Sequence, residues 1–272
     1  MARSNHTDCR QRALHQHDLQ AAAVRRIVAI AAPRATDLIW EPGAGTGAIT
    51  MALLAAGCRV TAVEIDRIRA TALHRTATAA GQADRLDLVV DDLRRAALPS
   101  PGPWQMIGNP PFMCTAALLR RLFLEADPLP ERMTLVLHSE AARKWAPPAG
   151  QGTHSGVIAQ LCGQARCGPT LARDATHPPS HVPLCLWTWH RHDTAPSRAE
   201  RQAVDRLLEH AFAGPHTVRD ALRHIATVPI LRRQGQRHGW HLNDHPRRLA
   251  ARAWLELTRF LVGIGRLGDP PQ

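Results

Sequence analysis

The sequence predicts an α/β protein whose sheet is mostly parallel, followed by a small all-helical domain. Short β-like runs alternate with helical stretches between residues 37 and 190, which is the pattern of βαβ units in a parallel sheet. A glycine-rich turn directly follows the first run, and no β-like run comes after residue 197. We therefore expect a flexible N-terminal arm at residues 1–18, an α/β domain at 19–195 and a basic helical domain at 196–272.

The spacing of apolar residues predicts each element of the α/β domain. Apolar residues recur at helical spacing over residues 19–32, which predicts a first helix there. The β-like runs are Asp37–Glu41, Arg59–Ile65, Leu86–Val90, Gln105–Gly108, Met133–His138 and Leu184–His190. Helices are predicted between them at Ala48–Ala56, Ile68–Ala80 and Ala116–Glu125. Proline-rich segments flank the last run, so we expect it at an antiparallel edge of the sheet or in a hairpin.

The C-terminal part reads as amphipathic helices at Ala199–Phe212, Val218–Ile225 and Pro246–Val262, with breaks at 214–215, 235–239 and 244–246. It is also the more basic part. Residues 191–272 hold fourteen arginines against eight acidic residues, within a chain of net charge +11. This is the charge distribution of a polyanion-binding domain, although a solvated arginine-rich helix face has the same composition.

Composition excludes several other classes of protein. A hydrophobic fraction of 44% is too high for a disordered chain, and no long uncharged stretch predicts a membrane-spanning helix. The polar N-terminus has no apolar core of the signal-peptide type. The six cysteines form no metal-type pair, and the sixteen histidines are scattered. We expect a cytoplasmic, reduced, metal-free monomer, with Trp187 and Trp189 in the core rather than stacked on bases.

The chemistry-bearing positions follow the predicted strands. The run Glu41-Pro42-Gly43-Ala44-Gly45-Thr46-Gly47 joins the first strand to a helix, and its glycines allow a ligand to approach the backbone closely. Glu64 closes the second strand, where a carboxylate can accept both ribose hydroxyls of an adenosine. Asp92 closes the third strand, where a carboxylate can accept the adenine amino group. Together they predict an adenosyl cofactor.

The fourth strand is followed by Asn109-Pro110-Pro111-Phe112. The Asn109 side chain and the Pro110 carbonyl can accept the hydrogens of a planar amino group, and Phe112 offers a face for a base. Holding a swung-out base by its edge and its face is the general solution for chemistry on a nucleobase. We therefore predict that Asn109, Pro110 and Phe112 are the catalytic residues.

Taken together, these motifs resemble the class I S-adenosylmethionine-dependent methyltransferases, with their Rossmann-like sheet. Within that class the chain resembles the ribosomal RNA adenine N6-methyltransferases, and its His138–Trp145 segment is closer to the Erm macrolide-resistance branch than to the KsgA branch. The resemblance implies S-adenosylmethionine held by His17, Leu19, Gly43, Gly45, Glu64, Asp92 and Asn109. It also implies RNA contacts, which we place at Arg143, Lys144, Arg232, Arg233, Arg247 and Arg248. The implied acceptor is an adenine of 23S rRNA, whose methylation blocks macrolide-type drugs.

The chain departs from the family pattern at a few positions, and alternatives stay open. His17 and Asp18 stand where the family has Asn-Phe, and Pro110 stands where it has a β-branched residue or Leu. An adenine of 16S rRNA, as in the KsgA branch, is the second choice of acceptor. The motif Asn-Pro-Pro-Phe also resembles DNA adenine and protein glutamine N-methyltransferases. A non-enzymatic nucleic-acid-binding factor on the same fold is a further alternative.

Overall fold

The computed structural model describes residues 18–214 and 217–268. Contacts divide them into two compact units. The first comprises residues 18–122, 126–142 and 166–190, and the second comprises 123–125, 143–165 and 191–268. The second unit is therefore more than a C-terminal segment, because it includes residues 143–165, which the sequence analysis assigned to the α/β domain.

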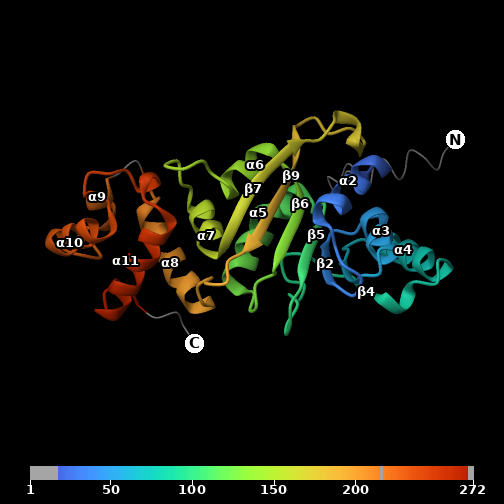
Figure 1. Ribbon diagram of the computed structural model, residues 1–272, viewed down its shortest axis with the longest axis horizontal. Coiled ribbons are helices and arrows are strands. Elements are labelled where there is room, and N and C mark those ends of the chain that lie inside the picture. Colours follow the sequence, from blue (N-terminus) through green and yellow to red (C-terminus); the bar gives the residue numbers. More distant parts are fainter. Residues whose placement is uncertain (1–17, 215–216, 269–272) are drawn as a thin grey trace. The chain divides into compact units, whose positions relative to one another are not determined.

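A seven-stranded sheet forms the centre of the first unit (Figure 1). Its strands, in spatial order, are β4 (Leu86–Val89), β3 (Arg59–Val63), β2 (Leu38–Pro42), β5 (Gln105–Gly108), β6 (Arg132–His138), β9 (Leu184–Arg191) and β7 (Gly163–Thr170). The first five are parallel to one another, and β9 pairs antiparallel with β6. All six predicted strands are confirmed. Trp187 and Trp189 on β9 are fully buried, which confirms that they are core residues.

The predicted antiparallel direction of β9 is confirmed, but its expected position at the edge is wrong, because β7 lies outside it and forms the edge. The segment Gly163–Thr170 contains two glycines and a proline and is largely exposed. Proline and glycine are tolerated at a sheet edge, but such a segment carries no alternating apolar pattern from which a strand can be predicted.

Four helices of the α/β region connect or cover these strands: α2 (Ala21–Ala31), α3 (Ala48–Ala55), α4 (Arg67–Ala79) and α5 (Phe112–Glu125). Helices α2 and α3 contact each other, and Ile27 and Leu53 are fully buried in the core they share with the sheet. Helix α5 begins four residues earlier than predicted. Phe112 is therefore its first residue rather than part of a loop.

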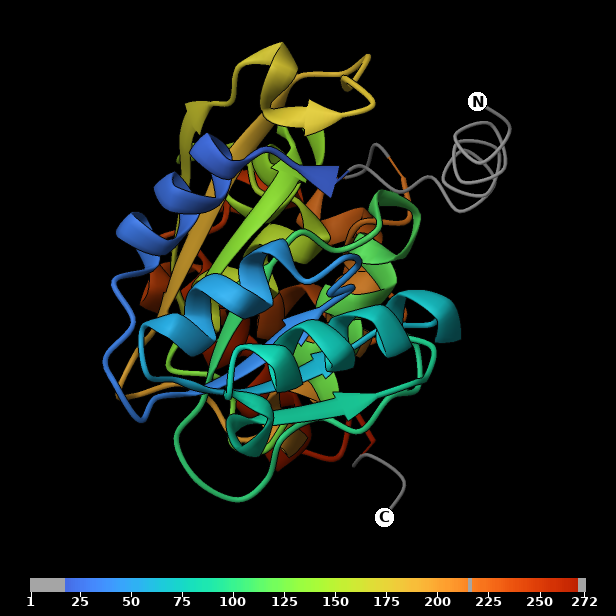
Figure 2. The ribbon, with the colours of Figure 1, turned by 90° about the vertical axis from the view of Figure 1, so that its right-hand side faces the viewer.

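A separate two-stranded sheet joins the segment just before α2 to a segment far along the chain. Strand β1 (Asp18–Leu19) pairs antiparallel with β8 (Thr176–His177), shown as blue and yellow arrows in Figure 2. A short 3-10 turn, η2 (Arg173–Ala175), precedes β8. Asp18 is thus a strand residue rather than part of a flexible arm, whereas residues 1–17 of the predicted arm lie outside the described residues.

The second unit is helical. It contains α7 (His154–Cys162), α8 (Arg198–Ala211), α9 (Val218–Leu222), α10 (Val228–His238), the 3-10 turn η3 (Pro246–Arg248) and α11 (Ala251–Gly263), together with the last residues of α6 (Ser139–Trp145). Ser197 and Glu200 form a capping box that starts α8. The core of this unit includes Leu207 and Trp254, both fully buried.

Helix α10 runs through a stretch where we predicted a break. Gly235 is buried inside the helix, and a Cβ atom there would lie 2.4 Å from the Trp240 carbonyl oxygen. This glycine is therefore required for packing and does not end the helix, which stops at Gly239 with φ of +74°. The helix predicted to start at Pro246 starts instead at Ala251, after η3.

None of the helices within residues 18–214 and 217–268 is both long and apolar enough to cross a membrane.

Candidate active site

The glycine loop between β2 and α3 forms the floor of a pocket. Gly43, Gly45 and Gly47 all have positive φ angles, between +60° and +87°, which L-residues with side chains rarely adopt. The Gly43 and Ala44 N–H groups donate to the Val63 carbonyl at 2.9 and 3.1 Å. The loop is thus tied to the end of β3.

Glu64 lies directly after β3 and fixes the same loop. Its two carboxylate oxygens accept hydrogen bonds from the Gly45 N–H at 2.7 Å and the Asp66 N–H at 2.9 Å. The side chain is buried. Since a carboxylate has about four acceptor positions, each oxygen keeps capacity for one further donor.

The predicted catalytic residues and most of the predicted cofactor residues meet around this loop. The pocket is an open one, and its roughly 540 Å³ of empty space includes open solvent. Its lining consists of Asp18, Leu19, Glu41, Gly43, Ala44, Gly45, Thr46, Ala48, Ile49, Glu64, Arg69, Asn109, Pro110, Pro111 and Phe112. Of the predicted cofactor residues, Asp92 is not in the lining, and His17 lies outside the described residues.

The segment Asn109–Phe112 forms the opposite wall. A Cβ atom on Gly43 would lie 2.8 Å from Pro111 Cδ, so the glycine loop and this wall approach as closely as backbone and ring allow. Pro111 is the N-cap of α5, and its carbonyl accepts the Cys114 N–H at 2.9 Å. This arrangement places Phe112 at the start of the helix, on the rim of the pocket.

His138 is a site residue that sequence reasoning did not single out by itself. It ends β6, and its ring lies 3.9 Å from that of Phe112, centroid to centroid, with the planes tilted by 48°. The Phe112 ring is therefore held against an imidazole on one side, which leaves a base to approach from another.

Asp18 and Arg69, both in the lining of the pocket, form an ion pair. The guanidinium donates to both Asp18 oxygens, at 3.1 and 3.0 Å. Arg69 lies in the first turn of α4, where the helix dipole disfavours a cation. The pair explains why Asp18 is accommodated where the resemblance has Phe.

Glu41 is a second buried acid of the pocket, beside Glu64. It is 1% exposed, and its Oε2 accepts a hydrogen bond from the Thr50 hydroxyl at 2.6 Å. Burial raises the pKa of Glu41 from 4.5 to about 8, against the opposing effect of the Thr50 hydrogen bonds. At neutral pH this carboxyl is therefore mostly protonated.

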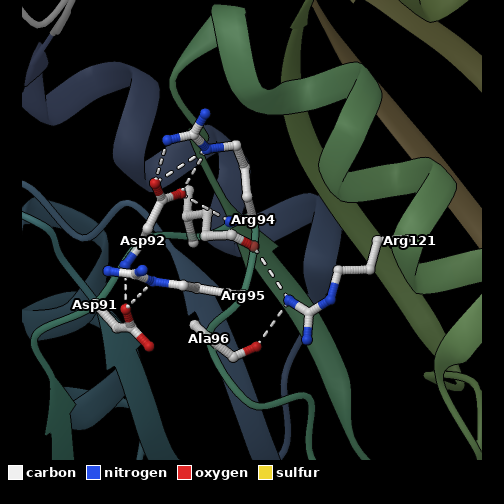
Figure 3. A network of polar contacts seen from close by, with 7 residues as sticks. Asp91, Asp92, Arg94, Arg95, Ala96 and Arg121 are labelled. Atoms are coloured by element: carbon white, nitrogen blue, oxygen red, sulfur yellow. Dashed lines mark hydrogen bonds and ion pairs between the residues drawn. The ribbon is translucent and has the colours of Figure 1, made fainter.

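Asp92, the predicted adenine-binding carboxylate, has a basic partner. Arg94 donates through its backbone N–H and its guanidinium to both Asp92 oxygens (Figure 3). These hydrogen bonds lower the pKa of Asp92 to about 2. Asp92 is thus ionised at neutral pH, with its oxygens covered by Arg94.

The predicted RNA-binding residues are all exposed and all belong to the second unit. Arg143 and Lys144 are on α6, Arg232 and Arg233 on α10, and Arg247 and Arg248 on η3. Adjacent residues connect two of these groups. The Thr153 hydroxyl donates to the Lys144 carbonyl, and the Gly152 N–H donates to the Arg247 carbonyl at 2.8 Å. Residues 152–153 therefore connect the two segments that carry the basic residues of α6 and η3.

In the part of the chain that the structure describes, no three His, Cys, Asp or Glu residues are grouped to hold a metal ion.

The glycine loop and the charged side chains of the pocket fit an adenosyl cofactor. A Cβ atom at Gly45 would lie 3.0 Å from Arg69 Nη1, so the absence of a side chain keeps that part of the pocket open. Glu64 offers carboxylate oxygens for ribose hydroxyls. Among the described lining residues, Asp18, Arg69 and Glu64 supply charges of both signs, which suits a ligand that carries an amino-acid group and a sulfonium.

Known proteins resemble this chain in sequence and in fold. The sequence model of the family described as "Ribosomal RNA adenine dimethylase" matches residues 10–228. The "Ribosomal RNA small subunit methyltransferase A" of Streptomyces coelicolor is 32% identical over 201 residues, which cover 72% of this chain and 70% of that protein. The protein of the same description from Thermosynechococcus vestitus is 27% identical and covers 90% and 94%.

Two solved structures show the same fold. The 23S rRNA methyltransferase ErmE has a TM-score of 0.72 at 22% identity and covers 90% of this chain and 99% of its own. A dimethyladenosine transferase from Plasmodium falciparum has a TM-score of 0.75 at 15% identity, with coverage of 92% and 98%. Both support the class I methyltransferase fold. The family match spans most of the chain, and we conclude that it belongs to the ribosomal RNA adenine dimethylases, which are S-adenosylmethionine-dependent rRNA adenine methyltransferases.

Proposed function

We propose that this chain transfers methyl groups from S-adenosylmethionine to the N6 amine of an adenine in small-subunit rRNA. The observation that carries the proposal is the single pocket shared by the glycine loop, Glu64 and the Asn109–Phe112 segment. The relatives named for small-subunit methylation support the choice of RNA. We expect the protein to act in the cytoplasm as a monomer, without a metal.

The cofactor-binding residues divide the work. Gly43 and Gly45 leave room for the ligand, and Leu19 closes the pocket from β1. Glu64 accepts hydrogen bonds from the ribose, and Asp92 accepts one from the adenine amine. When bound, S-adenosylmethionine supplies an electrophilic methyl group, so no residue of the chain needs to activate the donor.

The chain's task in the reaction is to prepare the acceptor. The adenine N6 lone pair is delocalised into the ring, which makes the amine a poor nucleophile. Hydrogen bonds from N6 to the Asn109 side chain and the Pro110 carbonyl favour a more tetrahedral nitrogen, while Phe112 stacks on the ring. Alignment of this nitrogen with the methyl group supplies much of the acceleration. The proton leaves to solvent afterwards.

The exposed arginine and lysine side chains of the second unit provide the RNA contacts. Arg143, Lys144, Arg232, Arg247 and their neighbours are placed on exposed turns of helices and on η3. Contacts of this kind with phosphates set affinity and register rather than base identity. The family match disfavours DNA, protein glutamine or mere binding as the role of this fold.

A second acceptor, an adenine of 23S rRNA, is favoured by one specific observation. The segment Ala141–Trp145 resembles the Erm branch, whose methylation confers resistance to macrolide-type drugs. The two candidates predict different modified RNAs, so one experiment decides between them.

The experiment uses the purified full chain, S-adenosylmethionine and two substrates, immature small ribosomal subunits and protein-free 23S rRNA. Reverse transcription stops at N6,N6-dimethyladenosine, so the modified position can be read directly. We expect new stops in small-subunit RNA. Stops in 23S rRNA alone, together with macrolide resistance in cells expressing the chain, would replace the first proposal by the second. Methylation of neither RNA would refute both.

A further inference from the structure

The segment after β4 contains two arginines that each pair with an aspartate. Arg94 is paired with Asp92, and Arg95 is paired with Asp91 (Figure 3). The side chains of Arg94 and Arg95 are 68% and 79% exposed, whereas that of Asp92 is 13% exposed. Arg94 and Arg95 are thus similarly exposed but pair with different aspartates. Only Asp92, the partner of Arg94, is a predicted cofactor ligand.

The hydrogen bonds of Arg94 cover the whole Asp92 carboxylate. Oδ1 accepts the backbone N–H at 2.9 Å and Nε at 3.0 Å, and Oδ2 accepts Nε at 3.0 Å and also Nη2. An incoming amine must therefore take an acceptor position that the guanidinium holds. Asp92 is also absent from the residues that line the pocket.

The backbone of this segment is fixed without the Arg94 guanidinium. The Arg95 and Ala96 N–H groups donate to the Asp92 carbonyl at 2.9 and 2.8 Å. Arg121 of α5 donates to the Ala96 carbonyl at 2.8 Å and to that of Leu93 at 3.3 Å (Figure 3). Displacing Arg94 therefore requires the movement of one exposed side chain, and the turn that holds Asp92 stays in place.

We propose that Arg94 is a displaceable cap on Asp92, which the adenine amine of the cofactor replaces and which then becomes available to a phosphate of the RNA. The proposal rests on the proposed function, since it assigns Asp92 to the cofactor. Arg94 is a positioning residue, because it acts through Asp92.

The competition has a consequence for affinity. Arg94 stabilises the cofactor-free state, and exposed ion pairs change an equilibrium by only about two- to fivefold. Removal of the guanidinium should therefore tighten cofactor binding by about this factor. An ordinary contact residue would give the opposite sign.

The released guanidinium also couples two ligands. A guanidinium forms strong, bidentate hydrogen bonds with phosphate, so RNA that binds Arg94 uncovers Asp92. Cofactor that binds Asp92 in turn frees Arg94. Such coupling is reciprocal in binding free energy, so each ligand should tighten the other by the same factor.

The test measures binding of S-adenosylhomocysteine, which carries the same adenine but no transferable methyl group, by calorimetry. The variant Arg94→Gln is compared with Arg95→Gln, its matched control, and thermal unfolding checks that both fold as the parent does. We expect Arg94→Gln to bind about two- to fivefold more tightly and Arg95→Gln to bind as the parent does. The 6-oxo analogue, S-inosylhomocysteine, lacks the amine and should bind equally to parent and Arg94→Gln.

The second arm repeats the titrations with the rRNA that the parent methylates. RNA should tighten S-adenosylhomocysteine binding to the parent and to Arg95→Gln, but no longer to Arg94→Gln. If Arg94→Gln bound S-adenosylhomocysteine no more tightly than the parent, or if Arg95→Gln bound it equally more tightly, the proposed role of Arg94 as a cap on Asp92 would be refuted. RNA coupling that survives in Arg94→Gln would overturn its link to phosphate. If the parent binds cofactor and methylates rRNA throughout, the proposed function stands whatever happens to this inference.

Discussion

Replacement of Glu41 by glutamine should make the stability of the protein less sensitive to alkaline pH. Glu41 lies under the glycine loop, 1% exposed, with a hydrogen bond from the Thr50 hydroxyl to Oε2 at 2.6 Å. Burial raises its pKa from 4.5 to about 8. The folded chain therefore holds a proton on this carboxyl at pH values where the unfolded chain has released it.

The sign and size of the effect follow from this difference in bound protons. Between pH 4.5 and about 8, the folded state binds about one more proton than the unfolded state, so the free energy of unfolding falls as pH rises. The slope is about 1.4 kcal/mol per pH unit. From pH 5.5 to 7.5 the contribution of Glu41 thus falls by about 3 kcal/mol. The stabilisation is complete below pH 4.5 and is lost as pH rises through about 8.

Glutamine keeps the shape and the acceptor for Thr50 but cannot ionise. Its amide N–H₂ group is buried in place of a hydroxyl, which costs about 1 kcal/mol at acidic pH. We therefore expect Glu41→Gln to be slightly less stable than the parent at pH 5.5 and more stable at pH 8.5.

The assay is urea unfolding of parent and variant at pH 5.5, 6.5, 7.5 and 8.5, followed by circular dichroism. Groups other than Glu41 titrate in both proteins, so the difference between the two isolates this carboxyl. A stability difference that is constant over this range would show that Glu41 is already ionised in the folded chain. The reasoning from burial would then be wrong.

Three further changes test other parts of the site. Gly43→Ala should weaken S-adenosylmethionine binding by about tenfold, because the φ of +72° is strained for alanine and its Cβ would meet Pro111 at 2.8 Å. Calorimetry measures the affinity, and an unchanged value would contradict the close approach of Gly43 and Pro111. Asp18→Asn leaves the guanidinium of Arg69, whose side chain is only 11% exposed, without a counter-charge, so the melting temperature should fall, and a rise would show that the ion pair is dispensable. The double change Arg232→Gln and Arg233→Gln should lower the slope of log K against log salt for rRNA binding by about 1.5, whereas an unchanged slope would remove both residues from the RNA contacts.

The parallel core of the fold was predictable because buried strands carry continuous apolar runs. The runs of β2, β3, β5 and β6 are each buried over most of their length, which makes them recognisable in one dimension. Strand β7 was not recognisable, because an edge strand depends on its neighbour for its hydrogen bonds rather than on its own side chains. The break predicted at Gly235 was wrong for a related reason. This glycine leaves room for Trp240, and that contact is visible only in three dimensions.

The pocket residues were predictable to the extent that they follow strand ends. Gly43, Glu64 and Asn109 meet because parallel strands end at one edge of the sheet. The charged partners could not be predicted in the same way. The pair of Asp18 and Arg69 joins positions 51 residues apart, and nothing in the sequence near Asp18 identifies its partner.

Methylation of the adenine N6 amine by parent and Asn109→Ala proteins tests the proposed role of Asn109 most directly. Parent and Asn109→Ala proteins are incubated with S-adenosylmethionine and rRNA, the RNA is digested to nucleosides, and methylated adenosines are measured by mass spectrometry. We predict N6,N6-dimethyladenosine from the parent and none from Asn109→Ala, although calorimetry should still detect cofactor binding by the variant. Equal amounts from both proteins, or a methyl group on a base other than adenine, would contradict this prediction.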